Sequence, residues 1–246
     1  RQTILPEEHN TMSTTQVLGE TPYASPGQPH ASLTGRIDAL PASFGLWSFI
    51  TLLSLGGFFE LYDLFQTGYI SAGLLAEGIF HTGQAGIFGI ADQAAFASAT
   101  FMGLFIGASL LAPLADKLGR RLTFMVALAW YGLFSLLMAT QSSAEGVIFF
   151  RFLVGIGLGI ELVTIDTYLS EWVPTHLRNK AFAFAFFIQF LSVPAVALMS
   201  WMLVPTTLFG LSGWRWVIIF GALFSLAIWF IRKKLPESAR WQIGRA

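Results

Sequence analysis

The chain has 246 residues, of which 54% are hydrophobic and 11% are charged, and its mean hydropathy is +0.64. The 14 basic and 14 acidic residues balance, which leaves no basic field for nucleic acid, so no nucleic-acid partner is expected. The sequence contains no cysteine, which excludes disulfides and thiolate chemistry, and its four histidines are scattered singly, so no cofactor or metal is expected. Such a composition is typical of a membrane protein.

In chain order, the sequence predicts a polar tail and then six membrane-spanning helices. Residues 1–43 are polar and rich in proline, which predicts a flexible cytoplasmic tail. A bilayer core is crossed by about 20 apolar residues in a helix. Six segments meet this length: 44–75, 93–115, 122–139, 146–169, 181–214 and 216–231. The fifth is longer than one crossing and is broken near Pro205, so its later part is expected to form an external loop. We therefore expect an all-α membrane protein with a six-helix transmembrane bundle over 44–232.

Lysine and arginine residues lie in alternate connections between these helices, and such residues favour the cytoplasmic side. They occur before the first helix, between the second and third, between the fourth and fifth, and after the sixth: Arg36, Lys117, Arg120, Arg121, Arg178, Lys180, Arg232, Lys233, Lys234, Arg240 and Arg245. Only Arg215 borders a predicted outer loop. The pattern predicts a multi-pass protein of the cell membrane, plasma or inner, with both termini in the cytoplasm and the lipid bilayer as its surroundings.

The short connection after the second helix carries Asp116, Gly119, Arg120 and Arg121. One interpretation is a set of cations that anchors the loop at the lipid headgroups. The string also resembles the G-x-L-a-D-R/K-x-G-R-R/K signature of the major facilitator superfamily, with Ala112 in place of the first glycine. This resemblance implies a cytoplasmic latch, in which the aspartate and the arginine hold the cytoplasmic side closed.

The fourth predicted helix carries an arginine inside an apolar run. Arg151 precedes Gly155 and Gly159, whose spacing gives a face that permits close approach to a neighbouring helix. An intramembrane arginine is costly unless it is paired or hydrated. The alternative is an arginine near the interface whose side chain extends to the headgroups. The run resembles the R-x-x-x-G-x-G motif in helix 4 of the same superfamily.

Two later strings resemble sugar porters. Glu171 and Arg178 match the pattern Y-x-S-E-x-x-P-x-x-x-R-G, although Asn179 replaces the last glycine, and Glu237 and Arg240 match P-E-S-P-R-W. The resemblance adds these four residues to the expected latch. It also implies a carrier of twelve helices in two six-helix halves. The chain is therefore expected to be the N-terminal half of a longer transporter, with 233–246 starting the loop between halves and the missing C-terminal half as its partner.

The first predicted helix contains two acids. Glu60 and Asp63 lie one turn apart and share a face with Thr67. Two carboxylates within one turn repel each other, so at least one is expected to bind a proton readily. We expect Asp63 to pair with Arg151 across the contact between helices 1 and 4, and these two residues to form a proton-coupling switch together with Glu60. Sugar-porter-like proton symporters, which these positions resemble, use an aspartate and an arginine in this way. A purely structural ion pair is the alternative.

Further polar residues are candidates for the substrate path or, alternatively, for hydrogen bonds between helices: Thr67, Glu161, Asp166 and Gln189. The helix 5 glutamine of sugar porters would fall at Phe186 here, which counts against a hexose carrier. The string from Phe59 to Phe65 instead resembles the F-F-D-x-Y-D-L-F of metabolite and aromatic-acid proton symporters.

The sequence therefore predicts a secondary active transporter that carries a small polar organic metabolite, such as an organic or aromatic acid, together with a proton by alternating access. The alternative is a transporter of the sugar-porter family. From other classes, an enzyme would need clustered nucleophile motifs, which the sequence lacks. A membrane receptor or sensor would need a soluble output domain, and residues 1–42 are too short and polar to form one.

Overall fold

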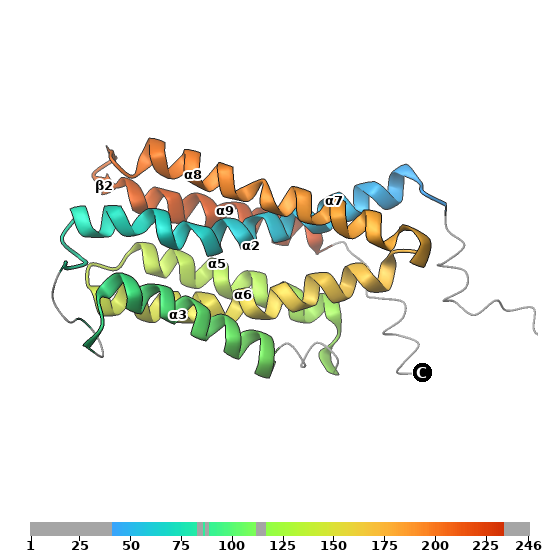
Figure 1. The fold of residues 1–246 in the computed structure, drawn as a ribbon, viewed down its shortest axis with the longest axis horizontal. Coiled ribbons are helices and arrows are strands. Elements are labelled where there is room, and N and C mark those ends of the chain that lie inside the picture. Colours follow the sequence, from blue (N-terminus) through green and yellow to red (C-terminus); the bar gives the residue numbers. More distant parts are fainter. Residues whose placement is uncertain (1–40, 83–85, 87–88, 112–116, 234–246) are drawn as a thin grey trace, which may run out of the picture.

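The computed structural model describes residues 41–82, 86, 89–111 and 117–233, which form a bundle of long helices (Figure 1). Most of the expected tail and nearly all of 233–246 lie outside these residues. The elements in chain order are α2 (Phe44–Ala76), α3 (Asp92–Ile106), η2 (Gly107–Leu111), α5 (Arg120–Ala139), α6 (Ala144–Trp172), η3 (Thr175–Leu177), α7 (Arg178–Phe190), α8 (Ser192–Leu203), β1 (Thr207–Leu208), β2 (Leu211–Ser212) and α9 (Gly213–Arg232).

The helices have the length and composition of membrane spans. Within the described residues, five are long and apolar enough to cross a bilayer: Phe44–Ala76, Arg121–Ala139, Ala144–Trp172, Thr175–Leu203 and Gly213–Ile231. The remaining predicted span corresponds to α3, whose 15 residues continue into the five-residue π-helix η2. The predicted all-α membrane fold is confirmed, with a helix at each of the six predicted segments.

The fourth predicted helix is longer than the predicted range of 146–169. It begins at Ala144 because the Ser143 side chain accepts a hydrogen bond from a backbone N–H of the first turn. It ends at Trp172, just before Val173 and Pro174, because the residue that precedes a proline is disfavoured in helical conformation. Glu171 therefore lies in the last helical turn and not in a loop.

The fifth predicted span, 181–214, begins three residues too late and is interrupted, while its predicted break near Pro205 agrees with the end of the helix. Its helical part begins at Arg178 and ends at Leu203, and α7 and α8 meet at Leu191. Pro194 accounts for the interruption, because it has no N–H to donate to the carbonyl four residues earlier. The expected external loop is the β1–β2 hairpin, and the last span begins at Gly213, three residues earlier than predicted.

The helices fall into two groups, which Figure 1 shows as two layers. One group contains α3, α5 and α6, with α6 packed against both of its neighbours, and the other contains α2 packed against α7, α8 and α9. The groups meet where α5 contacts α9 and where α2 contacts α6. Any polar interaction between α2 and α6 therefore links one group to the other.

Within the first group, α3 and α6 approach each other at the backbone. A Cβ atom added at Gly103, Gly155 or Gly159 would lie under 3.0 Å from a carbonyl oxygen of the facing helix. The predicted close approach at Gly155 and Gly159 is thus confirmed, and α3 is the neighbour. Because backbone atoms cannot turn aside as side chains do, this contact holds the two helices in one register.

One end of the bundle is joined by an ion pair that the sequence does not predict. The Arg215 cluster consists of Glu77, which follows α2, and Trp214 and Arg215 in the first turn of α9. Arg215 donates to a carboxylate oxygen of Glu77 at 3.2 Å and to the carbonyl oxygens of Ala139 and Gln141 at 2.6 and 2.8 Å. Its guanidinium also lies 4.4 Å from the centre of the Trp214 indole, whose N–H donates to Glu77. The cluster ties the ends of α2, α5 and α9 together.

We expect Arg215→Leu to destabilise the protein by about 1–3 kcal/mol, because the carboxylate and two carbonyl groups at helix ends lose their donor. Partial burial by itself would raise the pKa of Glu77, but three hydrogen bonds and the charge of Arg215 outweigh it and lower that pKa below its ordinary value of 4.5. A lowered pKa contributes stability above pH 4.5 that is lost as the pH falls further. Thermal unfolding of the detergent-solubilised protein should therefore show an acid-dependent loss that Glu77→Gln lacks. An unchanged melting temperature in Arg215→Leu would contradict this role.

Candidate functional site

Arg151 lies at the centre of the bundle, fully enclosed by protein. Its side chain is 0% exposed, and its Nη1 lies 3.1 Å from Oδ2 of Asp63, whose side chain is 3% exposed. The pair joins α6 to α2 and hence one helix group to the other. Because both charges are removed from water, each depends on the other for its stability in the membrane interior.

Further hydrogen bonds surround this pair. The Nη2 of Arg151 donates to the backbone carbonyl of Asp63 and to the hydroxyl of Thr67, both on α2. Its Nε donates to the hydroxyl of Thr100 on α3 at 3.0 Å. The Nε2 of Gln66 donates to the other carboxylate oxygen of Asp63. The guanidinium is thus held from two sides, by charged and neutral acceptors on α2 and by a neutral acceptor on α3.

Two other predicted acids are also buried, Glu60 on α2 and Glu161 on α6. Tyr131, a buried residue of α5, interacts electrostatically with Glu161, Asp63 and Glu60. Tyr131 therefore lies within electrostatic range of carboxyl groups on both α2 and α6.

The predicted substrate-path residues do not form one group. Thr67 belongs to the surroundings of Arg151, and Glu161 lies among the buried acids. Gln189 on α7 is buried against α2, where a Cβ at Gly57 would lie 2.6 Å from its amide carbon. Asp166 is half-buried on α6. Gln189 thus packs in the contact between α7 and α2.

The described part of the predicted latch makes two backbone contacts. Gly119 precedes α5 with a φ of 103°, a conformation that favours glycine, which explains this residue of the motif. Arg121 donates to the carbonyl of Lys233 after α9, and Arg178 donates to the carbonyl of Ser170 in α6 at 3.2 Å. Glu171 is half-buried in the last turn of α6. Asp116, Glu237, Arg240 and the side chain of Arg120 lie outside the described residues.

Two polar residues of the site escape prediction. Thr100 and Gln66 are uncharged, and a lone threonine or glutamine in an apolar helix is a weak signal, since its hydroxyl or amide is often satisfied within its own helix. The spacing of Gln66 three residues after Asp63 does place the two on one face of α2. No comparable signal relates Thr100 to Arg151, which lies 51 residues away.

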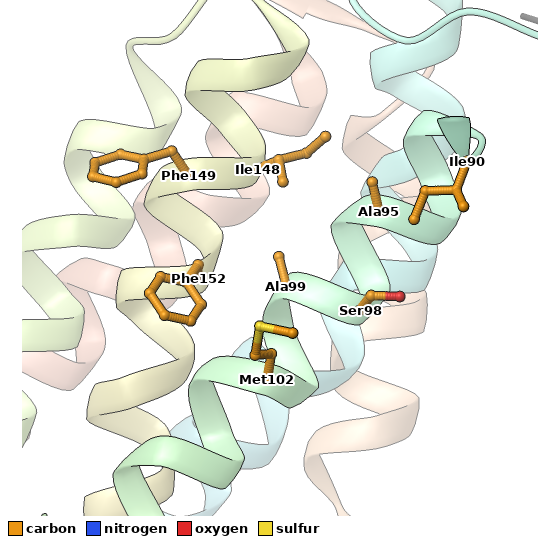
Figure 2. A pocket seen from close by; sticks show the side chains of 8 residues that line it. All are labelled: Ile90, Ala95, Ser98, Ala99, Met102, Ile148, Phe149 and Phe152. Atoms are coloured by element: carbon orange, nitrogen blue, oxygen red, sulfur yellow. The ribbon is translucent and has the colours of Figure 1, made fainter. Parts of the chain in front are cut away.

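An apolar pocket lies beside the site, between α3 and α6. It has a volume of about 440 Å³, and Figure 2 shows Phe149 and Phe152 of α6 across from Ala99 and Met102 of α3. No charged side chain lines it. Apart from the hydroxyl of Ser98 the lining is apolar, so the pocket offers no charged partner for an organic acid. Among the residues that the structure describes, no three histidine, cysteine, aspartate or glutamate residues are placed to hold a metal ion.

Two characterised relatives resemble the chain along most of its length. It is 28% identical over 213 residues to the niacin transporter NiaP of Acinetobacter baylyi, covering 87% of this chain and 46% of NiaP. It is 32% identical over 213 residues to the 4-hydroxybenzoate transporter PcaK of Pseudomonas aeruginosa, covering 85% of this chain and 44% of PcaK. The chain thus spans about half the length of the curated relatives it matches. Both relatives are transporters and not enzymes.

The fold is also that of a solved carrier. The structure of XylE, a major facilitator superfamily proton:xylose symporter bound to 6-bromo-6-deoxy-D-glucose, superposes with a TM-score of 0.71 at 19% identity. The match covers 82% of this chain and 47% of XylE. The six described helical segments therefore have the fold of the N-terminal half of a major facilitator carrier.

The family of this chain follows from its match to a family model over most of its length. The model described as sugar (and other) transporter matches residues 49–246, which include the six helical segments except the first five residues of α2, and both members of the buried ion pair. The chain belongs to the sugar (and other) transporter family of the major facilitator superfamily.

Proposed function

We propose that the chain forms half of a proton-coupled secondary carrier, in which Asp63 and Arg151 couple proton binding to alternating access. The observation that carries this proposal is the buried ion pair between the two helix groups. Deprotonated Asp63 attracts Arg151 and holds the groups together at their centre. Protonated Asp63 loses this attraction, which changes the relative stability of the outward-open and inward-open states. A bound proton can shift that equilibrium only through such a difference between states.

The proposed substrate is an organic acid, with an aromatic monocarboxylate favoured. The names of both characterised relatives identify aromatic acids, niacin and 4-hydroxybenzoate, and their identities of 28% and 32% exceed the 19% shared with XylE. The likeness to XylE concerns the fold. A sugar remains the second candidate, which the description of the family as a whole supports.

The proposed setting is the cell membrane, with both termini in the cytoplasm. Five described basic residues support this orientation, because they lie just before or in the first turn of α5, in the first turn of α7, and after α9: Lys117, Arg121, Arg178, Lys180 and Lys233. A second six-helix half is the proposed partner, since a single half supplies only one wall of a central substrate path.

Uptake by the complete carrier tests the proposal. We expect Asp63→Asn to abolish proton-driven accumulation of substrate while it keeps exchange of substrate across the membrane, because asparagine imitates the neutral state of Asp63. Accumulation of labelled 4-hydroxybenzoate, nicotinate and xylose would be measured in vesicles with an imposed proton gradient. Glu145→Gln, which removes an exposed carboxylate in the first turn of α6 outside the Arg151 network, is the control. Undiminished uphill accumulation by Asp63→Asn would refute the coupling role, and accumulation of xylose alone would refute the acid substrate.

A further inference from the structure

Thr100 contacts Arg151 through a hydroxyl group whose direction is already set. The Thr100 hydroxyl donates to the carbonyl of Phe96 at 2.9 Å, one turn earlier on α3. This bond directs a lone pair of the oxygen away from α3, and the Nε of Arg151 donates to it at 3.0 Å. The ring of Phe96 lies 5.6 Å from the guanidinium carbon and adds a cation–π contact from the same helix. Two successive turns of α3 therefore hold one face of the arginine.

The distance between Thr100 and Arg151 is set by backbone packing. A Cβ atom at Gly155, one turn after Arg151, would lie 2.5 Å from the carbonyl oxygen of Thr100 itself. A shift of α3 relative to α6 would have to break this backbone contact. The hydrogen bond from Arg151 to Thr100 thus lies inside a rigid pair of helices.

The contacts of Arg151 with α2 depend on charge in a way that its contacts with α3 do not. On α2 the negative partner is Asp63, accompanied by neutral acceptors. The titratable groups that interact with Asp63 are Tyr62 on α2 and Tyr131 on α5, and Tyr131 also interacts with Glu60 on α2 and Glu161 on α6. The titratable residue of α3 is Asp92 at its first position, about two turns from Thr100. Protonation of Asp63 therefore weakens the hold of α2 on Arg151 and leaves the hold of α3 unchanged.

We infer that Thr100 is a positioning residue that keeps Arg151 on the α3–α6 pair when Asp63 is protonated, so that α2 is the helix released. This inference rests on the proposed coupling role of Asp63 and adds which helices move when Asp63 is protonated. Arg151 stays fixed in both protonation states, and α2 moves together with the helices of its own group.

Spin-label distances in the complete carrier test the inference. This chain has no cysteine, so cysteines introduced at its exposed helix ends can be labelled selectively once the cysteines of the other half are replaced by serine. Labels at Ala76 and Glu145 report the separation of α2 and α6, and labels at Gln93 and Glu145 report that of α3 and α6, all at one end of the bundle. On acidification we expect the first distance to change and the second to stay constant.

Three variants separate positioning from packing. Thr100→Val removes the acceptor and leaves the guanidinium less well directed at Asp63, so the midpoint of the α2–α6 change should move to higher pH by about one unit. Thr100→Ser keeps a hydroxyl and should restore the original midpoint. Thr164→Val is the control, because this buried threonine of α6 also donates to a carbonyl four residues earlier but does not contact Arg151.

The outcomes distinguish this inference from the proposed function. Suppose that Asp63→Asn abolishes uphill uptake, but the midpoint pH of the α2–α6 change in Thr100→Val equals that of the wild type and of Thr164→Val. The positioning role of Thr100 is then wrong. If the α3–α6 distance changes with pH while the α2–α6 distance does not, the released helix is misassigned. If Asp63→Asn still accumulates substrate, the coupling proposal fails first. Elution of the variants as single species in size-exclusion chromatography would show that they fold.

Discussion

Arg151→Met should destabilise the protein more than any other single change of charge in the described helices, by about 3–5 kcal/mol. The arginine is completely buried and supplies the positive charge opposite Asp63. Methionine has a similar length but leaves the carboxylate of Asp63 in a site with little water, and it also leaves Thr67 and Thr100 without their donor. The measurement is thermal or denaturant unfolding of the detergent-solubilised carrier at neutral pH.

A double variant shows how much of this loss comes from the stranded charge. Asp63→Asn combined with Arg151→Met removes both charges, so part of the stability should return although transport stays abolished. Lys180→Met is the control, since it removes a cation that is exposed at the start of α7. Equal losses in Arg151→Met and Lys180→Met, or no recovery in the double variant, would show that the buried pair contributes little to stability.

The second large effect is expected from a single methyl group at the α3–α6 contact. Gly159→Ala places a Cβ against the carbonyl oxygen of Leu104 and the amide nitrogen of Ala108, which side-chain rotation cannot relieve. The helices must separate, and overpacking of this kind costs about 1–3 kcal/mol. Because the same contact fixes Thr100 relative to Arg151, the coupling of uptake to the proton gradient should weaken as well.

Gly68→Ala is the matched control for this variant. Gly68 lies in α2, and a Cβ atom there would meet nothing within 4 Å. Removing a glycine from a helix interior in open space should stabilise the protein by about 0.5–1 kcal/mol, so the two glycine variants are expected to have opposite signs. Melting temperatures of the two purified variants check this. A stable Gly159→Ala protein with normal uptake would mean that the helix contact is less rigid than the backbone distances imply.

The sequence by itself determined the class of the protein and the location of the membrane spans. Apolar segments of about 20 residues are needed to cross a bilayer, so composition alone reveals them. Charged residues inside such segments are costly, which is why Asp63 and Arg151 can be singled out without coordinates, and the resemblance to sugar-porter-like symporters is what pairs them. The same reasoning does not reach neutral residues, because a threonine in an apolar helix costs little and gives no sign of its partner.

Tertiary structure decided the rest. The neutral groups that surround Arg151 depend on how α2, α3 and α6 are brought together. The contact between Thr100 and Arg151 was therefore found only from the tertiary structure. The Arg215 cluster joins the ends of three helices that are distant in sequence, and local patterns carry no information about that meeting. Helix ends also shifted by a few residues, because Ser143, Pro174 and Pro194 act on single turns while hydropathy is averaged over whole spans. Burial is a property of a segment and can be predicted from composition, whereas hydrogen-bond partners are a property of the packing between segments.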